Sequence, residues 1–394
     1  MAYDFDTCPQ RRDTDSIKWN NYPQDILPMW VADMDFRSPP QIVEALITRA
    51  RHGVFGYPVG IVGNSKELDE LKGAIQERLA TNYNWQVDPG DLVFLPGVAR
   101  GFNMACHMFS GQGGSVLVET PMYPPILEAP SNAGLTRRDV ELQQDSQGEY
   151  RTDWDDFARG LDDQARLFIL CNPHNPVGRV FTPQELERKA AACLEAGVVI
   201  CSDEIHCELV YNGEQHVPIA SLSPEIADNC ITLMAPTKTF NMPGLQFSFA
   251  VIQNRELRKR FIKAENGLVG WVNLMGLAAA LAAYRHCQAW LDELLAYLED
   301  NRNFLSIYLQ EELPEINMVK PQGTYLAWLD CRESGLEEKN PYQHFLENGR
   351  VAVNDGATFG KGGEGFVRLN FGCPRSVLEE GLRRMKAALQ VTKL

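Results

Sequence analysis

Continuous apolar runs separated by helical stretches dominate the first 285 residues of this 394-residue chain. Runs without alternation between apolar and polar positions are typical of strands buried on both faces of a parallel sheet. We expect such strands at 91–97, 115–119, 166–171, 197–201, 230–234 and 246–252. Helical spacing of apolar residues predicts helices at 42–49, 67–80, 98–110 and 183–196. The alternation predicts an α/β fold with a large, doubly wound, mostly parallel sheet domain.

The pattern changes after residue 285. Leucines at helical spacing predict one face of a long helix that links two domains, at positions 291, 294, 295, 298, 305 and 309. Short strand-like pieces at 323–329, 351–353 and 365–372 precede a helix at 377–389. We therefore expect a large domain at 40–285 and a smaller α+β domain formed by 286–394 together with the N-terminal arm, 1–39.

Net charge and hydropathy indicate which kinds of binding partner this chain is not expected to have. The chain has 37 Lys and Arg against 52 Asp and Glu, a net charge of −15. An acidic balance of this size argues against a nucleic-acid or anionic-membrane surface. The one long uncharged run, 266–284, contains three glycines and many alanines, so we expect a buried helix and no membrane span.

The ten cysteines are scattered, and several lie within predicted strands, where they behave as small hydrophobic residues. Cys201, His206 and Cys207 are close in sequence, but no second cluster completes a metal site, so none is expected. The first residues lack the basic and apolar regions of a signal peptide, and we expect a cytoplasmic protein.

Polar residues follow two of the predicted strands. Lys238 comes shortly after the 230–234 run, in a loop that Pro243 and Gly244 close, and Asp203 follows the 197–201 run. Strand ends of an open α/β sheet converge on a ligand crevice. A lysine and an aspartate at neighbouring strand ends suit pyridoxal phosphate, with the lysine as its Schiff base and the aspartate on its ring nitrogen. A structural Lys–Asp ion pair is the alternative.

Other strand ends also carry candidate residues. Gly97 precedes a predicted helix whose first N–H groups form an anion site, although many such turns bind nothing. Prolines hold Tyr123 at the end of the 115–119 strand, where its ring either stacks on a planar cofactor or packs in the core. Asn175 lies in a proline-rich turn after the 166–171 strand. The irregular 27–36 segment either lines the site or packs as an arm.

Taken together, Tyr123, the Asn175–Gly178 motif, Asp203, Lys238 and Arg368 have the order and approximate spacing of a fold-type-I pyridoxal-phosphate (PLP) enzyme. The chain resembles the aminotransferase class I/II superfamily from about residue 3 to 390. Four motifs resemble, more narrowly, its MalY/PatB branch of cystathionine β-lyases and C–S lyases. They are Trp30–Phe36, Thr120–Pro125, Ser202–His206 and Lys238–Asn241.

This resemblance implies roles around the cofactor ring. Lys238 would bind PLP as a Schiff base and then act as the base that removes the substrate Cα proton, which requires an amine pKa of roughly 7–8. Asp203 would keep the pyridine nitrogen protonated. Asn175 would donate to the ring's phenolic oxygen. Tyr123 would stack on the ring and take part in proton transfer.

The resemblance also implies contacts to phosphate and substrate. The phosphate would lie at the helix N-terminus formed by Val98 and Ala99, with Thr237 as a further donor. Tyr57 would reach the phosphate in the neighbouring subunit, which implies a homodimer with shared active sites. Arg368 would form a bidentate pair with the substrate α-carboxylate, assisted by the backbone near Val31 and Ala32.

Three positions depart from the wider aminotransferase pattern. His206 stands where a tyrosine commonly contacts the ring oxygen, a substitution that is also familiar in the lyase branch. Ala235 replaces a common serine, and Gln246 replaces a common basic residue. Phosphate binding must therefore depend on other donors.

The function that the resemblance implies is PLP-dependent β-elimination. L-cystathionine or another cysteine S-conjugate, a small-molecule sulfur amino acid, would give a thiol, pyruvate and ammonia. The alternatives are a PLP-dependent aminotransferase, which shares the first proton abstraction, and a PLP-fold regulatory protein that acts through protein contacts.

Overall fold

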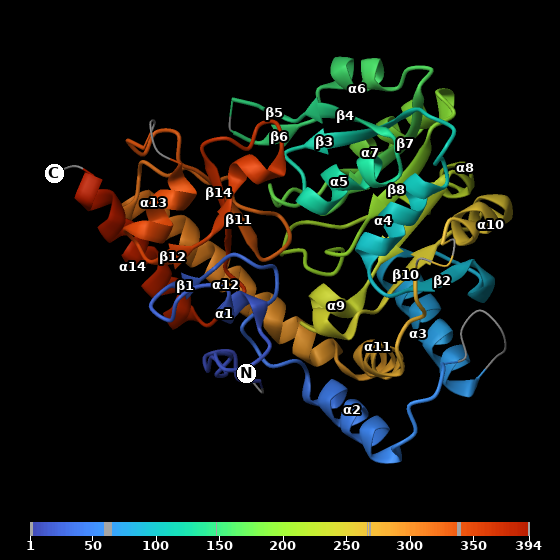
Figure 1. The fold of residues 1–394 in the computed structure, drawn as a ribbon, viewed down its shortest axis with the longest axis horizontal. Coiled ribbons are helices and arrows are strands. Elements are labelled where there is room, and N and C mark those ends of the chain that lie inside the picture. Colours follow the sequence, from blue (N-terminus) through green and yellow to red (C-terminus); the bar gives the residue numbers. More distant parts are fainter. Residues whose placement is uncertain are drawn as a thin grey trace.

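A seven-stranded sheet forms the centre of the computed structural model (Figure 1). The structure describes residues 3–58, 65–146, 148–265, 267, 269–336 and 340–392. In order across the sheet, the strands are β2 (Leu92–Leu95), β10 (Ser248–Val251), β9 (Cys230–Met234), β8 (Val199–Asp203), β7 (Ala165–Cys171), β3 (Ser115–Thr120) and β4 (Thr136–Glu141). Neighbouring strands run parallel except at β10, which is antiparallel to both β2 and β9. The predicted α/β class with a mostly parallel sheet is confirmed.

Helices cover both faces of this sheet, because alternate side chains of each strand enter different cores. Leu117 of β3 belongs to one core and its neighbours Val116 and Val118 to the other. The Leu117 core includes residues of α2 (Pro40–His52), α3 (Lys66–Tyr83), α6 (Trp154–Gly160), α7 (Pro183–Glu195), α8 (Pro224–Asp228) and α11 (Leu274–His286). The opposite core includes residues of α4 (Val98–His107), α5 (Pro124–Asn132) and α10 (Arg255–Lys263).

A second, smaller sheet is formed by segments that follow the long helix α12 (Gln288–Glu312) in the chain (Figure 1). Its antiparallel strands are β11 (Leu326–Asp330), β14 (Phe366–Asn370) and β13 (Asn354–Asp355). Around it lie α1 (Ile17–Asn20), α13 (Pro341–Glu347) and α14 (Arg375–Thr392), and a separate hairpin contains β5 (Gln143–Gln144) and β6 (Tyr150–Arg151).

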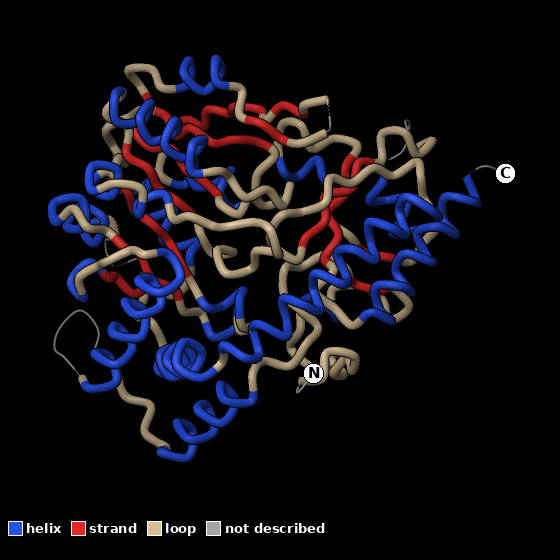
Figure 2. Tube along the Cα trace, turned by 180° about the vertical axis from the view of Figure 1, so that it is seen from behind, coloured by secondary structure: helices blue, strands red, loops and turns tan. Residues whose placement is uncertain are grey.

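The N-terminal arm is attached to the C-terminal part of the chain. β1 (Leu27–Pro28) pairs in parallel with β12 (Val351–Ala352). In both views the C-terminus lies at the outer edge of the molecule and the N-terminus lies lower and nearer the middle (Figures 1 and 2). On this arrangement we propose that 1–39 and 286–394 form a small domain beside the large one at 40–285.

Some local expectations differ from the structure. Lys238 lies within the short helix α9 (Pro236–Thr239), where we expected a loop, because Pro236 with its fixed φ starts a helical turn. Pro124 and Pro125 likewise begin α5 and leave Tyr123 as its N-cap. Only the later part of the run at 266–284 is helical: α11 begins at Leu274 and is packed, residues 269–273 form no helix, and Asn266 and Leu268 lie outside the described residues. No helix in the described part of the chain is long and apolar enough to cross a membrane.

Candidate active site

A cavity of about 230 Å³ opens at the carboxyl ends of β7, β8 and β9. The side chains and backbone that line it come from the N-terminal arm, from α4 and α9, from the turns after β3, β7 and β8, and from the segment between α9 and β10. They include Ala32, Gly97, Val98, Ala99, Arg100, Tyr123, Asn175, Asp203, His206, Thr237, Lys238 and Gln246. Segments far apart in sequence therefore meet at one edge of the sheet, as expected for an open α/β sheet.

Lys238 is presented by α9, directly after β9. Its Nζ donates a hydrogen bond to the backbone oxygen of Ala32. Burial lowers the pKa of this amine to about 8, with a further lowering from the Arg368 charge, while Asp33 and Asp203 act in the opposite direction. A substantial fraction of the amine is therefore neutral near pH 8, as a base requires.

Asp203 is the last residue of β8 and pairs in register with Leu233 of β9. The carboxylate is 4% exposed and accepts a hydrogen bond from the backbone N–H of Ile205 at 3.1 Å. Burial raises its pKa to about 7, and the backbone hydrogen bond and Lys238 only partly oppose this. Burial of this carboxylate is offset by only one backbone hydrogen bond and the charge of Lys238, so a cationic N–H donor placed in the cavity would stabilise its ionised form.

Two further ring side chains reach the cavity. His206 is buried, and burial with the charges of Lys238 and Arg368 lowers its pKa to about 3, so the imidazole is neutral. Its Nδ1 has no hydrogen-bond partner among the described residues. Tyr123 stands at the N-terminus of α5, and burial raises its pKa, so its hydroxyl is protonated and able to donate.

Arg368 enters from β14 of the small sheet and is 4% exposed. Its Nη1 donates to Asn175 Oδ1 at 2.9 Å, and its Nη2 donates to Asn354 Oδ1 at 2.6 Å and to the Trp30 backbone oxygen at 3.2 Å. Its Nε has no partner in the described part of the chain. Burial lowers its pKa to about 10, so the guanidinium remains charged near neutral pH. A buried guanidinium without a carboxylate partner is a ready site for an anion.

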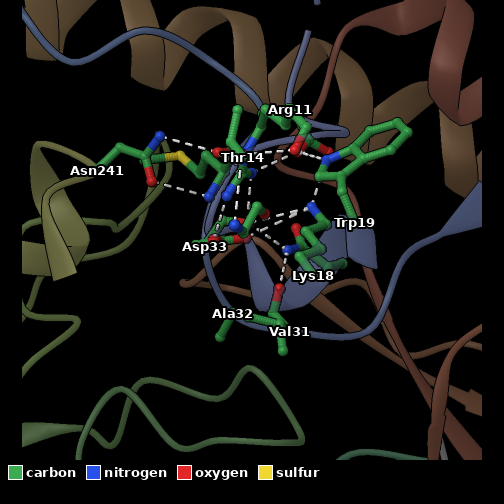
Figure 3. Close-up of polar contacts among 12 residues, drawn as sticks. Arg11, Thr14, Lys18, Trp19, Val31, Ala32, Asp33 and Asn241 are labelled. Atoms are coloured by element: carbon green, nitrogen blue, oxygen red, sulfur yellow. Dashed lines mark hydrogen bonds and ion pairs between the residues drawn. The ribbon is translucent and has the colours of Figure 1, made fainter. Parts of the chain in front are cut away.

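The segment from Trp30 to Phe36 is held in place by a buried ionic cluster (Figure 3). Asp35 is fully buried and accepts from Arg11 Nη1 at 2.7 Å, Lys18 Nζ at 2.7 Å and Trp19 Nε1 at 2.8 Å. Arg11 also binds Asp33 at 2.6 Å. This cluster fixes the backbone whose carbonyl groups bind Lys238 and Arg368.

Two asparagines fix the same segment from the other side. Asn241, three residues after Lys238, exchanges hydrogen bonds with the Met34 backbone at 2.9 Å and donates to the Phe36 oxygen at 2.8 Å. Asn370 of β14 donates to the backbone oxygens of Val31 and Asp33 at 2.6 and 2.7 Å. The arm therefore joins the lysine turn to the small sheet.

The N-terminus of α4 closes one end of the cavity. Its N-cap, Gly97, has φ 132°, a conformation that residues with a Cβ rarely adopt, and no side chain caps the helix. Gly101 lets α4 approach β9, because a Cβ at this position would lie 2.6 Å from Leu233 Cδ2. The backbone at Val98 and Ala99 is thereby placed at the cavity, with the first helical N–H groups directed outward from the helix end.

The structure brings most of the predicted site residues together. Ala32, Val98, Ala99, Tyr123, Asn175, Asp203, His206, Thr237 and Lys238 line the cavity, and Arg368 contacts it through Asn175. Val31 adjoins it and binds Asn370 through its backbone oxygen. Tyr57 is elsewhere: it is 90% exposed, and its ring meets Trp271 edge to face at 5.5 Å.

Sequence reasoning missed the residues that hold the others in position. These are Arg11, Lys18, Asp35, Asn241, Tyr325, Asn354 and Asn370. The Lys238–Asn241 and Trp30–Phe36 motifs contain two of them, but nothing local in sequence pairs one motif with the other. Their partners lie up to 339 residues apart.

Comparisons with known proteins agree with this geometry. The profile of the family described as aminotransferase class I and II matches residues 25–385. The chain is 42% identical, over 98% of its length and 99% of the relative's, to cystathionine beta-lyase PatB from Bacillus subtilis (strain 168). It also resembles two solved structures. A PLP-bound putative aminotransferase from Clostridium difficile 630 superposes with a TM-score of 0.93 at 36% identity, covering 98% and 100% of the two chains. The PLP-bound C–S lyase from Staphylococcus hominis superposes with a TM-score of 0.91 at 32% identity, covering 98% and 99%.

Proposed function

Because the chain belongs to the aminotransferase class I and II family, we propose that it is a PLP-dependent carbon–sulfur β-lyase. Its substrate would be L-cystathionine or a related cysteine S-conjugate, which with water gives a thiol, pyruvate and ammonia. The full-length similarity to a cystathionine β-lyase and to a C–S lyase supports this reaction over others in the family.

The side chains of the cavity fit PLP. Asp203 is a buried carboxylate that has no cationic hydrogen-bond donor among the described residues, and a protonated pyridine nitrogen is such a donor. His206 Nδ1 is a buried ring atom without a partner among the described residues. Asn175 Oδ1 accepts a hydrogen bond from Arg368, so the amide N–H₂ of Asn175 can donate to the ring's phenolic oxygen. When bound, PLP supplies an electron-accepting ring that stabilises negative charge at the substrate Cα.

Lys238 has the properties of the base in this reaction. Burial and the Arg368 charge lower its pKa to about 8, so its Nζ can accept the Cα proton near neutral pH. Tyr123, whose pKa burial raises, keeps its hydroxyl proton and can donate it to the departing sulfur. Proton donation from Tyr123 would favour this step, because the sulfur then leaves as a neutral thiol and not as a charged thiolate.

Arg368 would bind the substrate α-carboxylate. Its Nε has no partner in the described structure, and Asn175 and Asn354 hold both terminal nitrogens in a fixed plane. The backbone at Val31 and Ala32 lies beside the same position, held by Asn370 and Tyr325. A rigid guanidinium fork orients the amino acid so that its Cα faces Lys238.

The cofactor phosphate would occupy the N-terminus of α4. Val98 and Ala99 offer unpaired backbone N–H groups there, and the helix dipole favours an anion. Thr237, largely buried at the cavity wall, adds a hydroxyl donor.

The active form would be a homodimer. Val54, Phe55, Tyr57 and Trp271 are 60%, 64%, 90% and 56% exposed, an unusual concentration of large apolar side chains at the surface. Tyr57 lies outside the cavity of its own chain, which supports a role at the cavity of a second copy. We place the enzyme in the cytoplasm, and the ten free cysteines, nine of them buried, support a reducing compartment.

The single observation that carries this proposal is the meeting of Asp203, Lys238 and the Asn175–Arg368 pair at one cavity. The test is pyruvate release from L-cystathionine by the purified protein without added keto acid, comparing the wild type with Lys238→Ala. Pyruvate from the wild type alone, together with the absorption band of lysine-bound cofactor, is the expected result. Turnover that requires a keto acid would identify an aminotransferase instead, and the absence of the band would contradict the PLP assignment.

A further inference from the structure

We propose that Arg100, in the first turn of α4, is the cationic partner of the cofactor phosphate. This inference rests on the proposed function and adds a residue to it.

Arg100 stands where a helix disfavours a cation. The N-terminus of a helix carries a partial positive charge, and acidic residues are the ones usually favoured in its first turn. The first turn of α4 has no acidic residue, and its N-cap Gly97 has no side chain. An arginine at this position therefore adds positive charge to a positive helix end, and an anion that lies against both would make the arrangement favourable.

The guanidinium lies beside this helix end. Arg100 lines the same cavity as Val98, Ala99 and Lys238. Its Nη1 is 4.0 Å from the point that a Cβ on Gly97 would occupy, so the side chain folds back over the N-cap. No carboxylate in the described ranges forms a salt bridge with it, whereas fourteen other arginines, Arg11 and Arg78 among them, have acidic partners.

The charges of the cavity leave one cation for the phosphate. Among the described lining residues, only Lys238 and Arg100 carry a cationic side chain. Lys238 is required at the cofactor ring, His206 is neutral with a pKa of about 3, and Gln246 is an amide. A phosphate monoester carries roughly −1.5 to −2 charges at pH 7, whereas a helix N-terminus is equivalent to only about half a positive charge. Arg100 supplies the missing charge and, as a guanidinium, donates to two phosphate oxygens at once.

The decisive comparison is between PLP and pyridoxal, which lacks the phosphate. Each would be titrated into the full chain after the cofactor has been removed, with binding followed by absorbance. We expect Arg100→Gln to weaken PLP binding about tenfold or more, the range of one charge-assisted hydrogen bond, and to leave pyridoxal binding unchanged. Arg100→Lys keeps the positive charge but loses the two parallel N–H donors of the guanidinium, so it should lose less PLP affinity than Arg100→Gln. The control is Arg255→Gln, which removes an exposed arginine from the start of α10, away from the cavity.

A second readout separates phosphate binding from a structural role. Without cofactor, Arg100→Gln should leave the thermal midpoint unchanged or raise it, because it removes a cation from a positive helix end. With saturating PLP, the same variant should melt below the wild type. Inorganic phosphate should compete with PLP more weakly in the variant than in the wild type.

The outcomes distinguish the two proposals. If the wild type binds PLP and releases pyruvate but Arg100→Gln binds PLP like the wild type, the Arg100 assignment fails and the lyase stands. Equal weakening of PLP and pyridoxal binding, or destabilisation of the cofactor-free chain, would also overturn it. Failure of the wild type to bind PLP would overturn both proposals.

Discussion

Lys238 and Asp203 have pKa values that move in opposite directions for the same reason. Burial disfavours a charge on either group, so it lowers the pKa of the amine to about 8 and raises that of the carboxyl to about 7. Their attraction only partly offsets this cost. Without cofactor, the cavity therefore holds two buried groups whose charged forms are both destabilised.

Replacing Asp203 with asparagine should reveal this cost as a function of pH. The folded chain binds the Asp203 proton more tightly than the unfolded chain, so its free energy of unfolding falls as the pH rises from about 4 to 7. Asp203→Asn removes that loss and should stabilise the cofactor-free protein by about 2–4 kcal/mol at pH 8. Urea unfolding at pH 8 and at pH 4.5 measures the difference. The gain should shrink at pH 4.5, and an equal gain at both values would mean that Asp203 is not the titrating group.

Arg368→Lys tests the carboxylate site at the same scale. Lysine keeps the charge but loses the planar fork that Asn175 and Asn354 hold. We expect kcat/KM for cystathionine to fall about 10- to 100-fold, mainly through KM, since the interaction exists before and during the reaction. The cofactor absorption band should not change. A KM within twofold of the wild type would remove Arg368 from substrate binding.

At the scale of elements, the site depends on how the N-terminal arm is fixed. Within its described residues, 3–39, the arm has almost no regular structure, only α1 and the two-residue strand β1. Its backbone carbonyls at Trp30 and Ala32 nevertheless bind Arg368 and Lys238. The buried Arg11–Lys18–Asp35 cluster supplies the rigidity that secondary structure does not.

Lys18→Met should therefore affect both stability and catalysis. Lys18 and Asp35 are both fully buried, and breaking such a pair typically costs about 3–5 kcal/mol. We expect Lys18→Met to lower the free energy of unfolding by about 3 kcal/mol, since Arg11 and Trp19 still bind Asp35, and to lower kcat/KM through the displaced arm. Lys66→Met is the matched control: its partner Glu70 is 3.8 Å away, the two side chains are 89% and 49% exposed, and the change should stay within about 0.5 kcal/mol. Equal effects of the two variants would contradict the role of the cluster.

At the scale of the whole molecule, several large apolar side chains lie exposed to solvent in the isolated chain. This exposed apolar face, which we define as Val54, Phe55, Tyr57 and Trp271, lies away from the chain's own cavity. Its burial in a dimer would remove apolar area from water and bring Tyr57 to a second cofactor site.

Trp271→Glu should weaken the dimer without unfolding the chain, because the side chain is 56% exposed. We expect light scattering to give a lower mass for the variant at low protein concentration, and PLP affinity to fall as the dimer dissociates. Ile307→Glu on α12, 53% exposed, replaces a comparable apolar surface residue and should leave the mass unchanged. A variant that keeps the wild-type mass at every concentration would exclude this face from the interface.

The sequence by itself determined the strands that are buried on both faces and the polar residues at their ends. Continuous apolar runs such as those of β7 and β9 are typical of strands buried on both faces of a parallel sheet, so fold class and the placement of Asp203 and Lys238 at strand ends follow from local pattern. The apolar pattern did not predict β4 (Thr136–Glu141), because it is an edge strand rich in charged residues. The antiparallel direction of β10 was equally hidden, since an apolar run does not specify direction.

Only the tertiary structure decided what meets at the site. The contacts of Asn370 with Val31, of Arg368 with Trp30 and of Lys238 with Ala32 join residues more than 200 positions apart. Local sequence propensities do not predict such pairs, because the pairs form only when the arm, the large sheet and the small sheet pack together. The pKa values of Asp203 and Lys238 belong to the same category, since burial produces both shifts and burial exists only in the folded chain.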